Sequence, residues 1–159
     1  MDALTMNDGR TIPVEGYGVF LMSPAEVEEC LPQAIRLGYR HIDTANAYFN
    51  EKAVGRVVKA CGVPREELFI TTKLFPQSYP ADQCMKDIDA TLRRLDMDYV
   101  DLLLLHQPYG EYVQAWKVLE QAVKEGKVRS IGLSNFPEHK IKEILAVAEI
   151  VPAVQLRGV

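Results

Sequence analysis

The sequence predicts an α/β protein in which parallel strands alternate with helices. Five short apolar runs are each followed by a stretch with helical periodicity, and another apolar run follows near the C-terminus. The run Tyr99–Leu105 is almost unbroken, as is typical of a strand buried on both faces. Such alternation requires right-handed helical crossovers between parallel strands. An open doubly wound sheet and a (β/α)8 barrel both fit this pattern, although a complete barrel takes ~250 residues.

A β-hairpin precedes the alternating elements. The segments Leu4–Met6 and Arg10–Val14 flank Asn7-Asp8-Gly9, which is a strong hairpin-turn signal. We expect this hairpin to cover one end of the domain.

The predicted strands are short and apolar. They lie at Gly16–Leu21, His41–Asp43, Leu68–Lys73, Tyr99–Leu105 and Val128–Leu133, and a sixth starts within Pro152–Leu156. The glycines of the first strand allow close backbone approach. They do not form a dinucleotide fingerprint, because the G-x-G-x-x-G pattern fails at Leu21.

The predicted helices carry clear start and stop signals. They run from Ser23 to Leu37, Asn50 to Cys61, Pro80 to Leu95, Tyr112 to Lys124 and Asn135 to about Glu149. Ser23 and Glu26 form a capping box, while Asn50 and Asn135 are expected to cap their helices. Pro32 lies inside the first helix and predicts a kink or a break there.

Composition narrows the class of protein. The chain of 159 residues is 48% hydrophobic, which suffices for a single domain over residues 1–159 with a sizeable core. A net charge of -4 with intermixed signs indicates neither a nucleic-acid nor a membrane partner. No signal peptide is visible, and three widely spaced cysteines indicate neither a disulfide frame nor a metal site. We therefore expect a cytoplasmic protein.

Four polar residues end or follow successive predicted strands: Asp43, Tyr48, Lys73 and His106. Parallel strands of a barrel place such residues at one rim. A lysine ammonium within ~4–6 Å lowers the pKa of a phenol from ~10, and Asp43 can keep Lys73 charged. A neutral His106 can donate to a carbonyl oxygen on which negative charge develops. Each residue alone is more often a packing or capping residue, so the hypothesis rests on all four together.

The segment Gly38-Tyr39-Arg40-His41-Ile42-Asp43-Thr44-Ala45 resembles the signature of the aldo-keto reductases, in which a catalytic tyrosine follows. The resemblance implies a (β/α)8 barrel with an N-terminal hairpin, of which this chain covers five βα units and a sixth strand start. It implies that Asp43, Tyr48, Lys73 and His106 form the catalytic tetrad. The implied reaction is hydride transfer from NADPH, with NADH as an alternative, to an aldehyde or ketone. Tyr48 would supply the proton.

Further matches imply cofactor contacts. Ser134 and Asn135 resemble the family's serine–asparagine pair that hydrogen-bonds the nicotinamide carboxamide. Gly18 and Val19 match the first strand end, whose backbone passes the cofactor, and Asp43 belongs to the same surface. Gln155 stands for one of the amide residues of the family's sixth strand.

The substrate side is less clearly specified. Phe20 resembles the aromatic residue that lines the family's substrate pocket together with His106. Gln107 departs from the commoner tryptophan, so the particular carbonyl substrate stays open.

The tail Gln155–Val159 diverges from the family pattern and suggests a truncation, a frame change or a deliberate fragment. In the family, groups that bind the adenosine 2′-phosphate come from later units. Two alternatives to an active reductase therefore stand: an inactive fragment or regulatory module, and a small-molecule binding domain on an open α/β sheet. Unpaired sheet edges also predict self-association.

Overall fold

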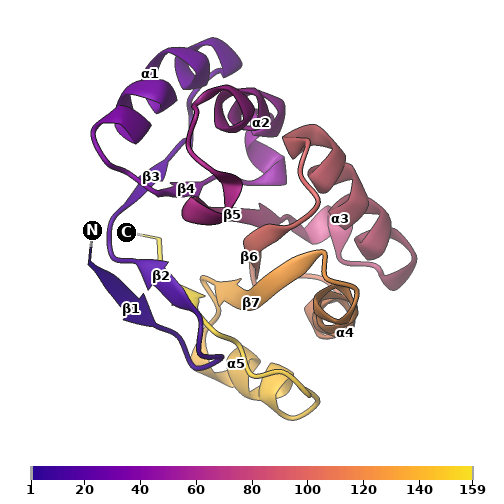
Figure 1. Cartoon of the computed structure of the whole chain (residues 1–159). Coiled ribbons are helices and arrows are strands. Elements are labelled where there is room, and N and C mark those ends of the chain that lie inside the picture. The colour runs from indigo at the N-terminus through magenta and orange to yellow at the C-terminus, as the bar shows by residue number, and fades with distance from the viewer. Residues whose placement is uncertain (1, 159) are drawn as a thin grey trace.

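A six-stranded parallel sheet forms the centre of the molecule, for which a computed structural model describes residues 2–158. The strands follow one another across the sheet in chain order: β3 (Gly16–Gly18), β4 (His41–Asp43), β5 (Phe69–Leu74), β6 (Val100–Leu105), β7 (Val128–Ser134) and β8 (Gln155–Leu156). The sheet curls into half of a barrel (Figure 1). This confirms the predicted incomplete (β/α)8 architecture over the open doubly wound alternative.

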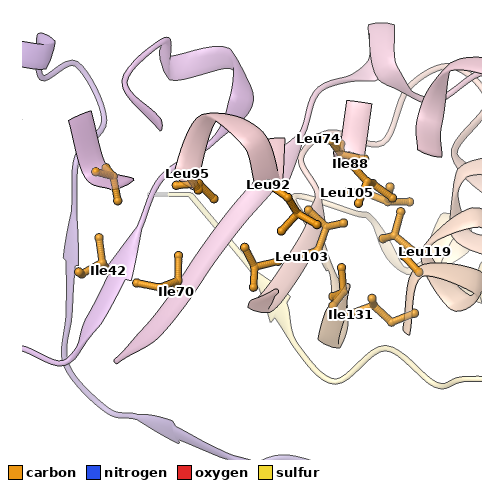
Figure 2. Packing of buried hydrophobic residues seen from close by; sticks show 14 of the residues in the cluster. Ile42, Ile70, Leu74, Ile88, Leu92, Leu95, Leu103, Leu105, Leu119 and Ile131 are labelled. Atoms are coloured by element: carbon orange, nitrogen blue, oxygen red, sulfur yellow. The ribbon is translucent and has the colours of Figure 1, made fainter. Parts of the chain in front are cut away.

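Five helices cover the outer face of this sheet within residues 2–158. They are α1 (Pro24–Arg36), α2 (Glu51–Ala60), α3 (Ala81–Leu95), α4 (Tyr112–Lys124) and α5 (Glu138–Leu145). The main core lies between the two layers, where Ile70 and Leu103 of the sheet face Leu92 and Leu119 of the helices (Figure 2). Burial of this continuous apolar layer holds each strand end in place.

The N-terminal hairpin lies at the end of the sheet opposite the carboxyl ends of the strands. It consists of β1 (Ala3–Thr5) and β2 (Thr11–Pro13), which pair antiparallel as predicted. The Asn7 amide donates to the Pro152 carbonyl at 2.9 Å, and the Ser130 hydroxyl donates to Asp8 at 2.5 Å. These bonds join the hairpin to β7 and to the segment before β8, so it closes this end of the half-barrel.

The predicted break at Pro32 is absent, because α1 runs without interruption from Pro24 to Arg36. The proline leaves the carbonyl of Glu28 without its helical partner, at a residue that is itself exposed. Burial of Val27 and Leu31 on the inner side and the capping box at Ser23 hold the helix together.

The prediction that Asn50 and Asn135 cap helices is wrong. Asn50 stands at the N-cap position of α2 but makes no side-chain cap, because its amide turns into the protein instead. The N-cap of α5 is Pro137, and Asn135 lies in the preceding loop with a left-handed backbone at φ 61°. Both asparagines therefore have tertiary rather than capping roles.

Two element ends also differ from the prediction. The strand expected to reach Leu21 ends at Gly18. The chain turns after it, since the Met22 amide donates to the Val19 carbonyl at 3.2 Å and Leu21 adopts a positive φ of 61°. Helix α5 ends at Leu145 rather than near Glu149. The backbone N–H groups of Glu149 and Ile150 donate to the buried Glu120 carboxylate at 2.6 Å each, which draws this segment out of the helix.

The cysteines are free thiols, and only Cys84 is fully buried, whereas Cys30 and Cys61 are half-buried. Within residues 2–158 no helix combines the length and the apolar character that crossing a bilayer requires. No cluster of metal-ligating side chains occurs in the same part of the chain.

Candidate active site

The carboxyl ends of β4, β5 and β6 bring the predicted reactive residues to one end of the sheet. Asp43 is the last residue of β4, Lys73 is the penultimate residue of β5, and His106 directly follows β6. The register places Lys73 beside Leu104, and the His106 amide continues the ladder by donating to the Leu74 carbonyl at 2.9 Å. The strands therefore position these side chains through regular backbone pairing.

Lys73 is the centre of the cluster. Its side chain is 2% exposed, and its ammonium donates to the Asp43 carboxylate, to the Thr44 carbonyl at 3.0 Å and to the Tyr48 hydroxyl at 3.4 Å. Burial lowers the pKa of Lys73, and the adjacent Asp43 carboxylate opposes that shift. The predicted Asp43–Lys73 pair is thus present, and all three ammonium hydrogens have acceptors.

Tyr48 lies in a short 3-10 turn, Asn46–Tyr48, that follows β4. Burial, together with the smaller effect of the Asp43 carboxylate, raises the pKa of Tyr48 to about 12. The prediction that Lys73 lowers this pKa is therefore wrong for the chain as described. The physical reason is that Asp43 offsets the lysine charge while burial disfavours a phenolate. The phenol consequently keeps its proton at neutral pH.

His106 is neutral near pH 7, as expected. Burial lowers its pKa to about 4, with a further contribution from the Lys73 charge. Its ring packs edge-on against Tyr48, with centroids 5.7 Å apart, and against Phe75 at 5.5 Å. Its Nδ1 atom is buried without a hydrogen-bond partner among residues 2–158.

The end of β3 forms the neighbouring part of the surface. The Val19 amide donates to the Asp43 carbonyl at 3.0 Å, which ties this strand end to β4. Gly18 faces open space, since an added Cβ would meet no atom within 4 Å. Phe20 is 63% exposed and its ring lies 5.0 Å from that of Tyr48, so it stands at the mouth of the site.

A second polar group surrounds the ends of β7 and β8. Ser134 ends β7, and its hydroxyl accepts from the Asn135 amide at 3.2 Å. The Asn135 side-chain oxygen accepts from the Gly158 amide at 2.9 Å. Gln155 donates to the Phe136 carbonyl at 3.0 Å, while its own side-chain oxygen is buried without a partner in residues 2–158. No hydrogen bond joins this group to the Lys73 cluster within the described chain.

Sequence reasoning missed several residues that shape the site. Asn46 and Tyr79 link the turns after β4, β5 and β6, and Asn50 binds the Val19 and Met22 carbonyls at 2.9 and 3.0 Å. Their partners lie 28 to 32 residues away, so no local pattern indicates them. Asn46 lies between two alanines, whereas Asn50 and Tyr79 each lie next to another polar residue and carry no such local signal.

Comparison with known proteins decides the family. The family model described as the aldo/keto reductase family matches residues 17–157. The chain belongs to the aldo/keto reductase family. A morphine 6-dehydrogenase of Pseudomonas putida is 42% identical over 154 residues, covering 95% of this chain and 52% of that protein. An aldo-keto reductase of Mycobacterium tuberculosis (strain ATCC 25618 / H37Rv) is 45% identical over 155 residues, which cover 96% of this chain and 55% of that protein.

Solved structures of aldo-keto reductases share the fold. An aldo/keto reductase from Brucella melitensis has a TM-score of 0.97 at 34% identity, covering 99% of this chain and 62% of its own. A Bombyx mori aldo-keto reductase in complex with NADP has a TM-score of 0.92 at 34% identity, and the match covers 99% of this chain and 58% of that one. The chain thus spans about half the length of the curated relatives it matches.

Proposed function

We propose that this aldo-keto reductase chain carries a site for NADPH-dependent reduction of an aldehyde or ketone to an alcohol. The observation that carries the proposal is the position of the Lys73 ammonium, which contacts both Asp43 and the Tyr48 hydroxyl beside a neutral His106. A half-buried acid, a buried lysine paired with it and a protonated phenol at one end of the sheet suit proton donation to a carbonyl oxygen.

The chain's own residues have separable roles in this proposal. Tyr48, whose phenol is protonated at neutral pH, donates its proton to the carbonyl oxygen. Lys73 stabilises the phenolate that remains, and Asp43 holds the ammonium in place. His106 donates a hydrogen bond to the same oxygen and orients the substrate, which Phe20 covers from the mouth of the site.

The residues around β7 fit the amide of a nicotinamide cofactor. The unpaired Gln155 oxygen lies on β8, whose residue Gln155 pairs with Leu133 next to Ser134. Ser134, Asn135 and Gln155 would hold the carboxamide, while the open Gly18–Val19 backbone would pass the ring together with Asp43. The bound nicotinamide supplies the hydride. The NADP complex of the Bombyx mori relative supports NADPH, and NADH is the alternative.

A binding or regulatory module without turnover is the second candidate. The observation that favours it is the open side of the half-barrel, since β3 and β8 each pair on one side only within the described chain. Water reaches an open site more readily and weakens the electrostatic contributions described above.

Substitution of Tyr48 tests the proposal. NADPH oxidation is measured with a reactive aromatic aldehyde for the wild type and for Tyr48→Phe. We expect the variant to lose at least ~100-fold in kcat, because the proton donor is removed, while its circular dichroism spectrum is unchanged.

Tyr112→Phe is the matched control, since its hydroxyl donates to Glu143 between α4 and α5. Wild-type turnover in the control together with full activity in Tyr48→Phe would contradict the assignment. Cofactor binding without any turnover by the wild type would favour the second candidate.

A further inference from the structure

The separation of Tyr48 and His106 is not set by the sheet alone. Tyr48 lies in the turn Asn46–Tyr48 after β4, and the facing turn Pro76–Ser78 follows β5. Each is a single 3-10 turn without a side-chain cap. The hydrogen bonds of a 3-10 turn have poorer geometry than those of an α-helix, so contacts from outside the turn add to its definition. Two side chains outside the predicted catalytic set supply such contacts.

Asn46 joins the first turn to the second. Its side-chain oxygen accepts from the Phe75 amide at 3.1 Å, and its side-chain nitrogen donates to the Ser78 hydroxyl at 3.1 Å. Phe75 in turn places its ring edge-on against His106, with centroids 5.5 Å apart. Asn46 therefore acts on the Tyr48 turn, two residues away, and on an aromatic wall of His106.

Tyr79 joins the second turn to the end of β6. Its hydroxyl donates to the Gln107 carbonyl at 2.8 Å and accepts from the Gln107 amide at 3.1 Å. Gln107 directly follows His106, and the phenol satisfies both of its backbone groups as the chain leaves the sheet. The Tyr79 ring has no exposed surface, so the hydroxyl is held in one place. The Tyr79 hydroxyl thus holds the backbone at Gln107, where the chain leaves the sheet next to His106.

We propose that Asn46 and Tyr79 are positioning residues that together fix the Tyr48 hydroxyl relative to the His106 ring. The chain of contacts runs from the Tyr48 turn through Asn46 to Phe75 and Ser78, and from Tyr79 to Gln107. The effect of these contacts on catalysis rests on the proposed function, whereas their effect on the positions of Tyr48 and His106 does not. A misplacement of about 1 Å between reacting groups costs as much as 100-fold in rate.

The hydroxyl of Tyr79 can be separated from the packing of its ring. Tyr79→Phe keeps the buried ring and removes only the group that binds Gln107. Asn46→Ala removes both turn-to-turn bonds at a half-buried position. Tyr112→Phe again serves as the control, because it loses a tyrosine hydroxyl contact between α4 and α5.

The primary experiment is nuclear magnetic resonance of the whole chain with labelled histidine, tyrosine and tryptophan, at constant pH and without cofactor. The ring signals of His106 and Tyr48 are assigned with His106→Gln and Tyr48→Phe. We expect Tyr79→Phe and Asn46→Ala each to shift both sets of signals, while His139 and the Trp116 indole keep their positions. Unchanged His106 and Tyr48 signals in both variants, or the same shifts in Tyr112→Phe, would overturn the proposal.

The second experiment is kinetic. If Asn46 and Tyr79 both fix the distance between the Tyr48 hydroxyl and the His106 ring, each single variant lowers kcat by about 10-fold or more. The NADPH dissociation constant stays unchanged. The double variant then loses less than the product of the two single losses, because the link is already broken. Fully multiplicative losses would contradict a shared link. A wild type without turnover would count against the proposed function alone, since the resonance experiment still decides the positioning.

Discussion

The Lys73 ammonium is buried, yet it has a complete set of acceptors. Its bonds reach Asp43, the Thr44 carbonyl and Tyr48, which come from the end of β4 and the turn after it. A buried lysine without such partners would lose its proton, because burial disfavours the charged form. The sequence predicted the pairing of Asp43 with Lys73, but the raised pKa of Tyr48 follows from burial and from the carboxylate charge. The protonation states of Lys73 and Tyr48 therefore depend on their burial and on the neighbouring Asp43 carboxylate.

The lowered pKa of His106 predicts a pH dependence of stability. In the unfolded chain a histidine takes up its proton below about 6.5, whereas folded His106 resists protonation down to about 4. The unfolded state thus binds more protons as the pH falls through this range, and the folded state loses stability. We expect His106→Gln to reduce that loss by about 1 kcal/mol, allowing for the partial exposure of the ring.

Urea unfolding at a series of pH values, followed by Trp116 fluorescence, measures this effect. Burial also lowers the pKa of His41, so part of the loss persists in the variant. His139→Gln at an exposed position is the control. Identical pH profiles for the wild type and His106→Gln would show that His106 titrates normally in the folded state.

At the scale of elements, α2 is held against its neighbours by a buried acid and a close helix contact. Glu51 is 1% exposed and accepts from Thr72 of β5 and from Arg94 of α3, both at 2.7 Å. Gly55 of the same helix lies against the Leu95 carbonyl. These contacts set the position of α2, and the turn that carries Tyr48 leads directly into this helix.

Substitution of Gly55 tests the closeness of α2 and α3. At an exposed helical position Gly→Ala stabilises by about 1 kcal/mol. Here an added Cβ would lie 2.3 Å from the Leu95 carbonyl oxygen, a backbone atom that cannot move without displacing α3. We therefore expect Gly55→Ala to destabilise the fold by about 2 kcal/mol. Urea unfolding measures the change, with Lys52→Ala on the exposed face of α2 as the control. A more stable Gly55→Ala protein would contradict the packing described here.

For the whole molecule, the feature that matters most is the pair of free sheet edges. Strands β3 and β8 each have one neighbour within the described residues, and unpaired backbone groups on such edges recruit other strands. Apolar side chains at or near the β8 edge are exposed as well, with Val151 at 56% and Leu156 at 39%. The single-domain organisation predicted for residues 1–159 stays a prediction for the isolated chain.

We expect the purified chain of 159 residues to self-associate in a concentration-dependent manner. Light scattering and sedimentation at several concentrations measure the mass of the assembly. A charged side chain on an edge strand opposes strand pairing, so Leu156→Lys should shift the distribution towards the monomer. A monomer at every concentration, for both proteins, would show that the edges do not recruit a second copy.

The succession of strands and helices, the ends of most helices and the polar residues at strand ends could all be predicted from the chain, because each depends on local signals. The barrel-like order of the strands within the sheet and the tetrad roles were implied by the family resemblance instead, since local signals also fitted an open doubly wound sheet. Apolar runs, capping boxes and glycine stops act over a few residues, and polar residues at strand ends identify one rim of a parallel sheet. The contacts of Asn46, Asn50, Glu51 and Tyr79 could not be predicted in this way. Apart from the Thr44 hydroxyl, which donates to Asn50 from six residues away, their side-chain partners lie more than twenty residues away and meet them only when neighbouring βα turns pack together. The raised pKa of Tyr48 belongs to the same class, since burial and a nearby carboxylate exist only in the folded chain.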